Sequence, residues 1–136
     1  MFVKESVYNK TFIINENIYN GFIACSSDKN PLHIDDTFAK SKGFPKKVMH
    51  GNILNALISY FIGECLETKN VLIQSQTINF SKPFFLGDNL QFEAIIENIY
   101  DSVNTVEFKF KFYNKEKNLK IAYGKIFISI ILWKYL

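Results

Sequence analysis

The sequence predicts a single α+β domain in which a mostly antiparallel sheet packs against one long helix. The chain has 136 residues, 48% of them hydrophobic and 21% charged, which is enough for one sizeable core. Residues 51–66 are apolar almost all round, as expected of a buried helix. After about residue 70 the chain alternates between apolar and polar residues in the manner of strands. We therefore expect one domain over residues 1–136, with no linker or internal repeat.

Residues 7–14 are predicted to form the first strand, which ends at the turn residue Asn15. The same Asn15 caps a helix that runs to about Cys25, with apolar residues at helical spacing on one face. Cys25 and Cys65 lack the spacing of a metal site, and we interpret them as two buried thiols in a reducing compartment. A disulfide between them stays open, because the sequence carries no information on their distance.

A second helix is predicted to begin at Pro31, after an Asn30 cap. Proline fits the first helical position because its missing N–H would have no partner there. This helix continues to about Lys40, where the sequence Lys-Gly-Phe-Pro at residues 42–45 breaks it. Residues 46–49 then form an extended connection to the long helix of residues 51–66.

The long helix carries its few polar and small residues in one stripe. They recur at intervals of three and four, so they share a face: Asn52, Asn55, Ser59 and Gly63. Such a stripe on an otherwise buried helix faces either a functional site or a subunit boundary, and for Asn52 and Asn55 both interpretations stay open.

The remainder of the chain is predicted to form four strands, at residues 71–80, 90–99, 105–113 and 119–132. Their connections carry turn residues at Gly87-Asp88, Asp101-Ser102 and Asn114-Lys115. With the first strand they complete an antiparallel sheet that covers the long helix with one face. Because so many Phe and Tyr residues would remain on the other face, we expect a second copy to cover it and hence a homodimer.

The charge pattern excludes several classes of partner. The net charge is +3 and the lysines are scattered, so no basic stripe indicates a nucleic acid. Phosphate groups on a small cofactor or carrier fit this mild charge better.

The longest apolar run, residues 126–133, is too short to span a bilayer and is rich in strand formers, and the N-terminus carries no signal segment. We therefore expect a cytoplasmic protein without a membrane partner.

Asp28 and His33 form a candidate acid–base pair. His33 falls in the first turn of the helix predicted at Pro31, where free N–H groups and the helix dipole disfavour an imidazolium. A neutral imidazole is the form that a general base requires. Asp28 lies in the loop that enters this helix, close enough to share a water molecule with His33. The alternative is a structural histidine beside an ordinary loop acid.

Three segments resemble the MaoC-like dehydratases and (R)-specific enoyl-CoA hydratases of the hotdog fold. They are Asp-Lys-Asn-Pro-Leu-His-Ile-Asp at residues 28–35, Val-Met-His-Gly at 48–51, and Ile-Asn-Phe-Ser-Lys-Pro-Phe-Phe-Leu-Gly-Asp at 78–88. The pattern extends from about residue 12 to residue 90, and the last three strands match in layout only. The resemblance implies an antiparallel five-stranded sheet wrapped around a long central helix.

The resemblance also implies a hydro-lyase that interconverts trans-2-enoyl and (R)-3-hydroxyacyl thioesters. The acyl carrier would be coenzyme A or acyl carrier protein, with no other cofactor and no metal. Asp28 and His33 correspond to the pair that holds and activates the water, and the N–H of Gly51 to the oxyanion donor. Ser59 corresponds to a supporting serine. His50 is interpreted as a structural histidine at the helix entry.

Two departures from the family pattern concern the substrate. Lys29 stands where the family more often has a small or aromatic residue, which makes the mouth of the site more basic. Asn52 and Asn55 stand where an apolar lining is common, which predicts a short or polar acyl group because unpaired buried amides are costly. We also place Asn30 and Lys82 among the substrate-binding residues.

Two other functions remain open at this point. A thioesterase shares the hotdog fold, and the fold alone does not separate hydrolysis from hydration. A non-catalytic acyl-binding module is the other alternative, although the presence of both Asp28 and His33 argues against it.

Overall fold

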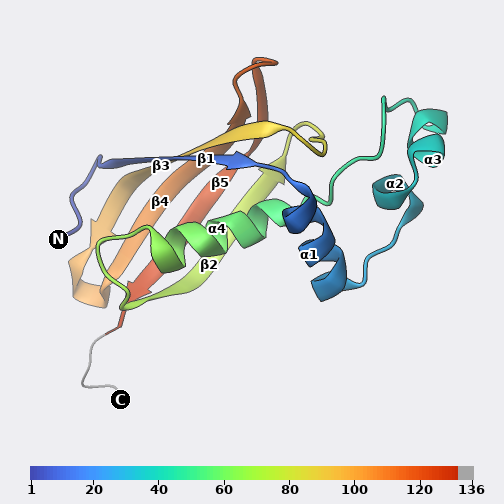
Figure 1. Cartoon of the computed structure of the whole chain (residues 1–136). Helices are drawn as coiled ribbons and strands as arrows, with labels where there is room; N and C mark the ends of the chain where they lie inside the picture. The colour runs from blue at the N-terminus through green and yellow to red at the C-terminus, as the bar shows by residue number, and fades with distance from the viewer. Residues whose placement is uncertain (132–136) are drawn as a thin grey trace.

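A five-stranded antiparallel sheet curves around one long helix, α4, in the computed structural model, which describes residues 1–131 (Figure 1). The elements in chain order are β1 (Val7–Ile13), α1 (Glu16–Ser26), α2 (Pro31–Ile34), α3 (Asp36–Ser41), α4 (Ile53–Glu64), β2 (Val71–Phe80), β3 (Asn89–Tyr100), a 3-10 turn (Asp101–Val103), β4 (Thr105–Asn114) and β5 (Leu119–Ile130). The strands lie in the order β1-β3-β4-β5-β2, and each neighbouring pair is antiparallel. The predicted sheet and its central helix are therefore confirmed.

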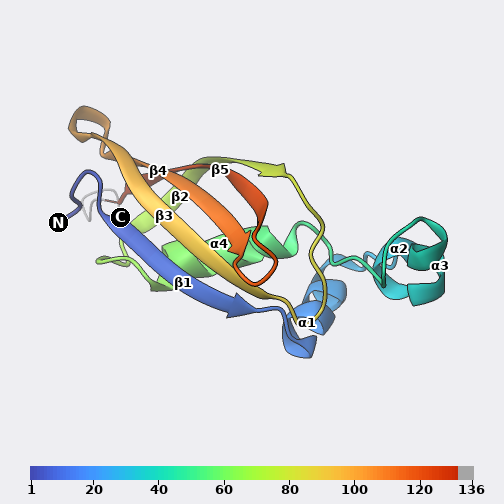
Figure 2. The ribbon, with the colours of Figure 1, turned by 90° about the horizontal axis from the view of Figure 1, so that it is seen from above.

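The core lies between α4 and the inner face of the sheet, as the view from above shows (Figure 2). Strand residues alternate between the two faces of a sheet, so Phe108, Phe110 and Phe112 of β4 all point toward the helix. Phe61 of α4 packs against Phe92 of β3, with ring centroids 4.8 Å apart. Aromatic residues thus fill the space between helix and sheet.

The outer face of the sheet is charged, and our expectation of an aromatic outer face is wrong. Lys125 pairs there with Glu107 at 2.9 Å, and Lys111 lies 3.8 Å from Glu93. The reason is the register of β4, whose alternate residues place its phenylalanines on the helix side and its lysines outside. A homodimer must therefore rest on a different feature of the fold.

The helix predicted from Pro31 to Lys40 is broken at Asp35 into α2 and α3. Asp35 has an extended backbone, and its carboxylate accepts hydrogen bonds from the N–H groups of Thr37 and Phe38. It is therefore the N-cap of a new helix, because a capping residue cannot itself be helical. The two short helices project from the body beyond α1 in both ribbon views (Figures 1 and 2).

Helix α4 begins at Ile53, so the prediction of a helical start at Gly51 is wrong by two residues. Gly51 and Asn52 form a turn that leads into it. The helix ends at Glu64, and Cys65 is its C-cap. Both cysteines are free thiols; Cys65 is partly buried, but Cys25 is exposed, which corrects the expectation that both are buried.

The strands agree with the predicted ranges to within one or two residues. β5 ends at Ile130, and residue 132, where the prediction placed its end, lies outside the described residues.

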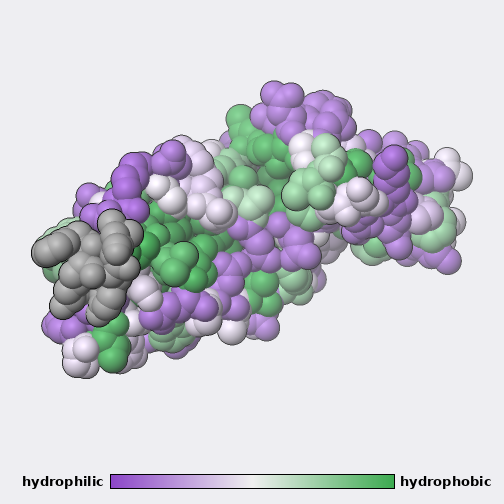
Figure 3. Space-filling model, turned by 90° about the horizontal axis from the view of Figure 1, so that it is seen from below, coloured by the Kyte–Doolittle hydropathy of each residue, from purple (hydrophilic) through white to green (hydrophobic). Residues whose placement is uncertain are grey.

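Seen from below, the end with α2 and α3 is largely hydrophilic, and hydrophobic residues gather over the body that holds α4 (Figure 3). Within residues 1–131, none of the helices has the length and apolar character needed to cross a membrane.

Candidate active site

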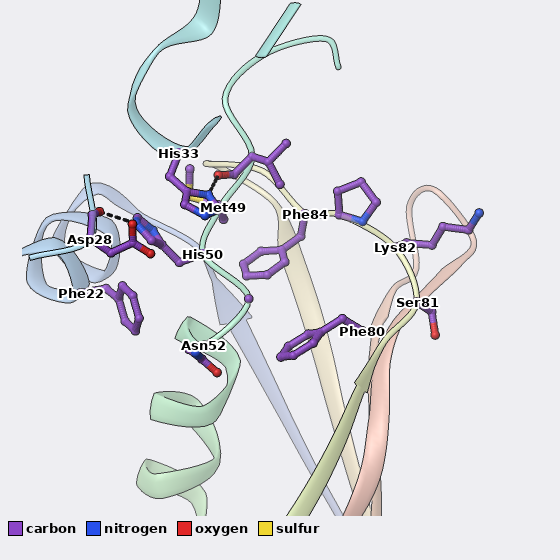
Figure 4. A pocket seen from close by; sticks show the side chains of 13 residues that line it. Phe22, Asp28, His33, Met49, His50, Asn52, Phe80, Ser81, Lys82 and Phe84 are labelled. Atoms are coloured by element: carbon purple, nitrogen blue, oxygen red, sulfur yellow. Dashed lines mark hydrogen bonds between the residues drawn. The ribbon is translucent and has the colours of Figure 1, made fainter. Parts of the chain in front are cut away.

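A pocket of about 480 Å³ opens where the chain enters α4. Figure 4 shows one wall formed by Asp28, His33 and His50 and the other by the end of β2 and the residues that follow it. The polar lining residues are Asp28, His33, His50, Asn52, Ser81 and Lys82. The apolar lining comes mainly from Phe22, Val48, Met49, Phe80, Pro83 and Phe84. Three segments far apart in sequence thus converge on one cavity.

Asp28 lies in the loop between α1 and α2, and local hydrogen bonds shape this loop. The N–H of Asp28 donates to the hydroxyl of Ser26 at 3.1 Å, and one carboxylate oxygen accepts from the N–H of Asn30 at 3.1 Å. Such a bond to the residue two positions on is the geometry of an Asx turn. From this loop Asp28 lines the pocket.

His33 lies in α2 and is held at both its ring and its backbone. Its Nδ1–H donates to the carbonyl oxygen of Val48 at 2.7 Å, and its own carbonyl accepts from the hydroxyl of Tyr19 at 2.6 Å. A carbonyl only accepts, so Nδ1 carries the proton and Nε2 is left with a free lone pair. Because α2 is a single turn, this bond orients the imidazole more directly than the helix dipole that the sequence suggested.

The side chains of Asp28 and His33 lie close together, but no hydrogen bond joins them directly in the described structure. One carboxylate oxygen of Asp28 and one ring nitrogen each of His33 and His50 all lie within 4.8 Å of one another. Two hydrogen bonds of about 2.8 Å can bridge such a gap through one water molecule. A carboxylate and a free imidazole nitrogen are groups that can take a proton from that water and return one.

Gly51 supplies a free backbone donor beside this pair. Within residues 1–131 its N–H donates no hydrogen bond, because Gly51 lies in the turn directly before the N-cap of α4 and therefore has no intrahelical acceptor. An added Cβ at Gly51 would lie 3.0 Å from a ring carbon of Phe80. Gly51 thus lines the pocket at a point where the Phe80 ring leaves no room for a side chain.

The structure separates the predicted substrate-binding residues into two groups. Asn52 and Lys82 line the pocket. Asn55 does not: it donates to Asn52 at 2.8 Å and accepts from Gln76 of β2 at 2.7 Å, so its amide joins α4 to the sheet. Because the amide of Asn55 has protein partners, it gives no reason to expect a polar acyl chain.

The remaining predicted residues lie outside the pocket lining. Asn30 is exposed and caps α2 by accepting from the N–H of Leu32 at 3.0 Å. Lys29 is exposed beside it, and Ser59 is exposed on α4, about two turns beyond Gly51. Their roles toward a substrate stay predictions.

Ser81 is one polar lining residue that the sequence did not assign to the site, and His50 is another. It is 2% exposed, its Nε2–H donates to the carbonyl oxygen of Asp28 at 2.9 Å, and its ring stacks on His33 with centroids 4.1 Å apart. The sequence signal that could have indicated a role of His50 in the site is its position directly before Gly51. A histidine at a helix entry is, however, also compatible with a purely structural role.

Asp28, His33 and His50 are also residue types that bind divalent ions. An ion shared by two histidines lies close to the plane of each ring. The rings of His33 and His50 are stacked at an interplanar angle of 29°, so their planes do not meet near the nitrogens. The present arrangement fits a water molecule between Asp28 and His33 better than a shared ion.

Comparison with known proteins places these features in a family. A model described as the MaoC like domain matches residues 3–116. The chain is 38% identical over 73 residues to an (R)-specific enoyl-CoA hydratase of Aeromonas caviae, which is 54% of each protein. It is 30% identical over 79 residues to a 3-hydroxybutyryl-CoA dehydratase of Methylorubrum extorquens, 58% of this chain and 50% of that protein. The matched stretch thus spans about half the length of these curated relatives.

Solved structures confirm the predicted hotdog fold. R-hydratase PhaJ1 of Pseudomonas aeruginosa in its unliganded form superposes with a TM-score of 0.86 at 27% identity, covering 96% of this chain and 83% of that one. The (R)-hydratase of A. caviae involved in PHA biosynthesis gives a TM-score of 0.87 at 22% identity, covering 95% and 97%. Because the family model matches residues 3–116, which is most of the chain, the chain belongs to the MaoC-like dehydratase family.

Proposed function

We propose that this protein is an (R)-specific hydro-lyase that interconverts trans-2-enoyl and (R)-3-hydroxyacyl thioesters. The observation that carries the proposal is the approach of the Asp28 and His33 side chains within 4.8 Å in one pocket, beside the free N–H of Gly51. Two of its relatives, an (R)-specific enoyl-CoA hydratase and a 3-hydroxybutyryl-CoA dehydratase, support the same reaction class.

The three groups supply what the addition of water to an enoyl thioester requires. Asp28 and His33 hold one water molecule, and one of them removes a proton from it as its oxygen bonds to C3 of the substrate. The electrons of the double bond move toward the thioester carbonyl, whose developing negative charge the N–H of Gly51 stabilises. A proton from the Asp28–His33 pair then reaches C2, so that one water molecule is added in total.

Crotonyl-CoA provides the direct test, because hydration removes the absorbance of its conjugated enoyl thioester. We expect activity in the wild type and a loss of about 10²- to 10⁴-fold in kcat for Asp28→Asn and for His33→Ala. Asp101→Asn, at an exposed residue of the 3-10 turn, is the matched control and keeps wild-type activity.

Release of free thiol from acyl-CoA without loss of the enoyl group would instead indicate a thioesterase. Inactivity of the wild type on enoyl thioesters of both coenzyme A and acyl carrier protein would indicate an acyl-binding module. Either result contradicts the proposed reaction.

We further propose that the protein is a homodimer, now on the basis of the sheet edge. β2 is the last strand of the sheet and pairs only with β5 within the described residues. A ten-residue open edge offers unpaired N–H and C=O groups to a second copy, and Leu72 and Phe80 on it are 61% and 52% exposed. Light scattering on the eluted protein should give twice the chain mass of 15.8 kDa, and a monomer mass would contradict the proposal.

A further inference from the structure

The segment from Val48 to Gly51 contributes to every group of the candidate active site. The carbonyl of Val48 accepts from the His33 ring, the His50 ring donates to the Asp28 carbonyl, and Gly51 presents its free N–H. Two backbone hydrogen bonds hold the segment itself, from Val48 N–H to the Leu32 carbonyl and from Met49 N–H to the Phe84 carbonyl, both at 3.0 Å. Four consecutive residues therefore set the relative positions of acid, base and oxyanion donor.

His50 is the member of this segment that contacts both sides of the acid–base pair. It is part of the pocket lining, with its ring 4.9 Å from that of Phe22 and 4.1 Å from that of His33, centroid to centroid. Its Nε2–H reaches the backbone of Asp28 at 2.9 Å (Figure 4). No other residue in the described part of the chain makes both of these contacts.

The bond to Asp28 matters because the loop that carries this acid is exposed. Residues 27–30 are all exposed, and the bonds of the Asp28 N–H to Ser26 and of the Asp28 carboxylate to Asn30 are local to the loop. The hydrogen bond from His50 joins the loop to a buried side chain. Without it the carbonyl of Asp28 would be free to turn to solvent, and the carboxylate would move with it.

The chemistry of His50 argues against a role as simple core filling. Because Nε2 donates to a carbonyl, Nδ1 is left with a bare lone pair, and this atom is buried without a hydrogen-bond partner among residues 1–131. An unpaired buried polar atom costs about 1–3 kcal/mol, which a phenylalanine of similar shape would avoid. The Nε2–H donor is what a phenylalanine could not supply.

We propose that His50 is a positioning residue that sets the geometry of Asp28 and His33 without contacting the reacting atoms. The proposal rests on the proposed hydratase function. His50 holds the Asp28 loop by hydrogen bonding and the plane of the His33 ring by stacking, so that the carboxylate and Nε2 of His33 remain on opposite sides of one water molecule.

Two substitutions separate the two contacts. His50→Phe keeps an aromatic ring against His33 but removes the donor to Asp28, whereas His50→Gln keeps an amide donor at a similar reach and removes the stacked ring. We expect His50→Phe to lower kcat by about 10²-fold, the effect of misplacing a catalytic group by about 1 Å, while KM stays within about threefold. His50→Gln restores part of that loss.

Phe61→Leu is the control for a loss of stability alone. Phe61 is fully buried in α4 away from the pocket, so its truncation lowers the melting temperature and leaves kcat unchanged per folded molecule. His50→Phe loses one hydrogen bond but also one unpaired buried nitrogen, so its melting temperature should stay close to that of the wild type. Wild-type kcat in His50→Phe, or a loss of kcat that follows the melting temperature as in Phe61→Leu, would overturn the proposal.

Crystal structures of both variants test the positioning independently of the reaction. We expect the Asp28 carboxylate of His50→Phe to move away from His33 by about 1 Å or more, and His50→Gln to keep the loop in place. An unmoved Asp28 loop in His50→Phe refutes the positioning role. If the wild type proves inactive on every enoyl thioester, the proposed function fails, and the displacement of this loop still decides whether His50 positions Asp28.

Discussion

The hydroxyl of Tyr19 in α1 donates a hydrogen bond of 2.6 Å to the backbone carbonyl of His33. Tyr19 is 5% exposed, and the ammonium group of Lys47 lies 4.5 Å from its ring centroid. The bond joins α1, which packs on the body, to the short helix that carries the candidate base. A helix of one turn has little stability of its own, so the position of His33 depends on such contacts.

Tyr19→Phe should therefore destabilise the protein by about 1 kcal/mol, the usual effect of losing one hydrogen bond. We expect kcat on crotonyl-CoA to fall by up to about tenfold, which corresponds to about 1.4 kcal/mol in the activation barrier. Urea denaturation and steady-state kinetics measure the two effects. Tyr60→Phe is the control, because the hydroxyl of the exposed Tyr60 has no partner within residues 1–131. Equal effects of the two substitutions would contradict a specific role of Tyr19.

Gly51→Ala tests the space around the candidate oxyanion donor. The new Cβ would lie 3.0 Å from the ring of Phe80, so either that ring or the Gly51 backbone must shift. We expect kcat to fall by about 10-fold or more, since removal of an oxyanion donor costs about 10²- to 10³-fold. Gly63→Ala, in α4 with nothing within 4 Å of the added Cβ, should stabilise the helix by about 0.5–1 kcal/mol and leave kcat unchanged. A kcat equal to that of the wild type in Gly51→Ala would count against the donor role.

Asn52→Leu tests the effect of the pocket lining on substrate choice. Asn52 is the residue of the predicted polar stripe that lines the pocket, and leucine at this position makes the wall more apolar. We expect the ratio of kcat/KM on octenoyl-CoA to that on crotonyl-CoA to rise by about tenfold. This factor lies within the range of discrimination that contacts of substrate methylene groups with an apolar pocket provide. An unchanged ratio would show that the acyl chain does not reach Asn52.

Gly124→Ala should destabilise the sheet strongly. The added Cβ would stand 1.9 Å from the carbonyl oxygen of Thr77, a backbone atom of the neighbouring strand that cannot move without opening the β2–β5 pairing. We expect a loss of about 3 kcal/mol or more in the free energy of unfolding, measured by urea denaturation. Gly21→Ala, a helical position with nothing within 4 Å, is the control and should be slightly stabilising. A small loss at Gly124 would contradict the close approach of this residue to the Thr77 carbonyl oxygen.

The ion cluster on the outer face predicts a dependence of stability on acid pH. Glu107 is 3% exposed and accepts hydrogen bonds from Lys125, Tyr100 and Asn98. Burial alone would raise the pKa of the Glu107 carboxyl, but the bonds from Lys125, Tyr100 and Asn98 hold it below its ordinary value of 4.5. A lowered pKa contributes stability above the ordinary value, and this contribution is lost as the pH falls through the folded-state pKa.

Glu107→Gln should therefore melt earlier than the wild type at neutral pH, and the difference should narrow as the pH falls below about 4.5. Thermal melts between pH 3 and pH 7 measure this difference. Glu64→Gln is the matched control: Glu64 also pairs with a lysine, Lys69 at 2.7 Å, but both are exposed and the pair contributes little. A difference for Glu107→Gln that is independent of pH would exclude the ionised carboxylate as its cause.

Local sequence determined the elements of the fold because each carries its own pattern. Alternation fixed the strands to within one or two residues, and the caps at Asn15 and Asn30 fixed two helix starts. The break at Asp35 was also encoded locally, since its carboxylate caps α3, but a continuous helix was an equally regular interpretation. The pattern of residues 28–35 was enough to single out Asp28 and His33.

Tertiary structure alone decided how these groups meet. The contacts of Val48 with His33, of His50 with Asp28 and of Tyr19 with His33 join residues 14 to 22 positions apart, and no local pattern encodes them. The same holds for Asn55, whose amide the sequence assigned to the substrate and the fold assigns to Gln76. The sequence by itself determined which residues are chemically suited to the proposed reaction. Their distances depend on packing between segments, which is a property of the whole fold.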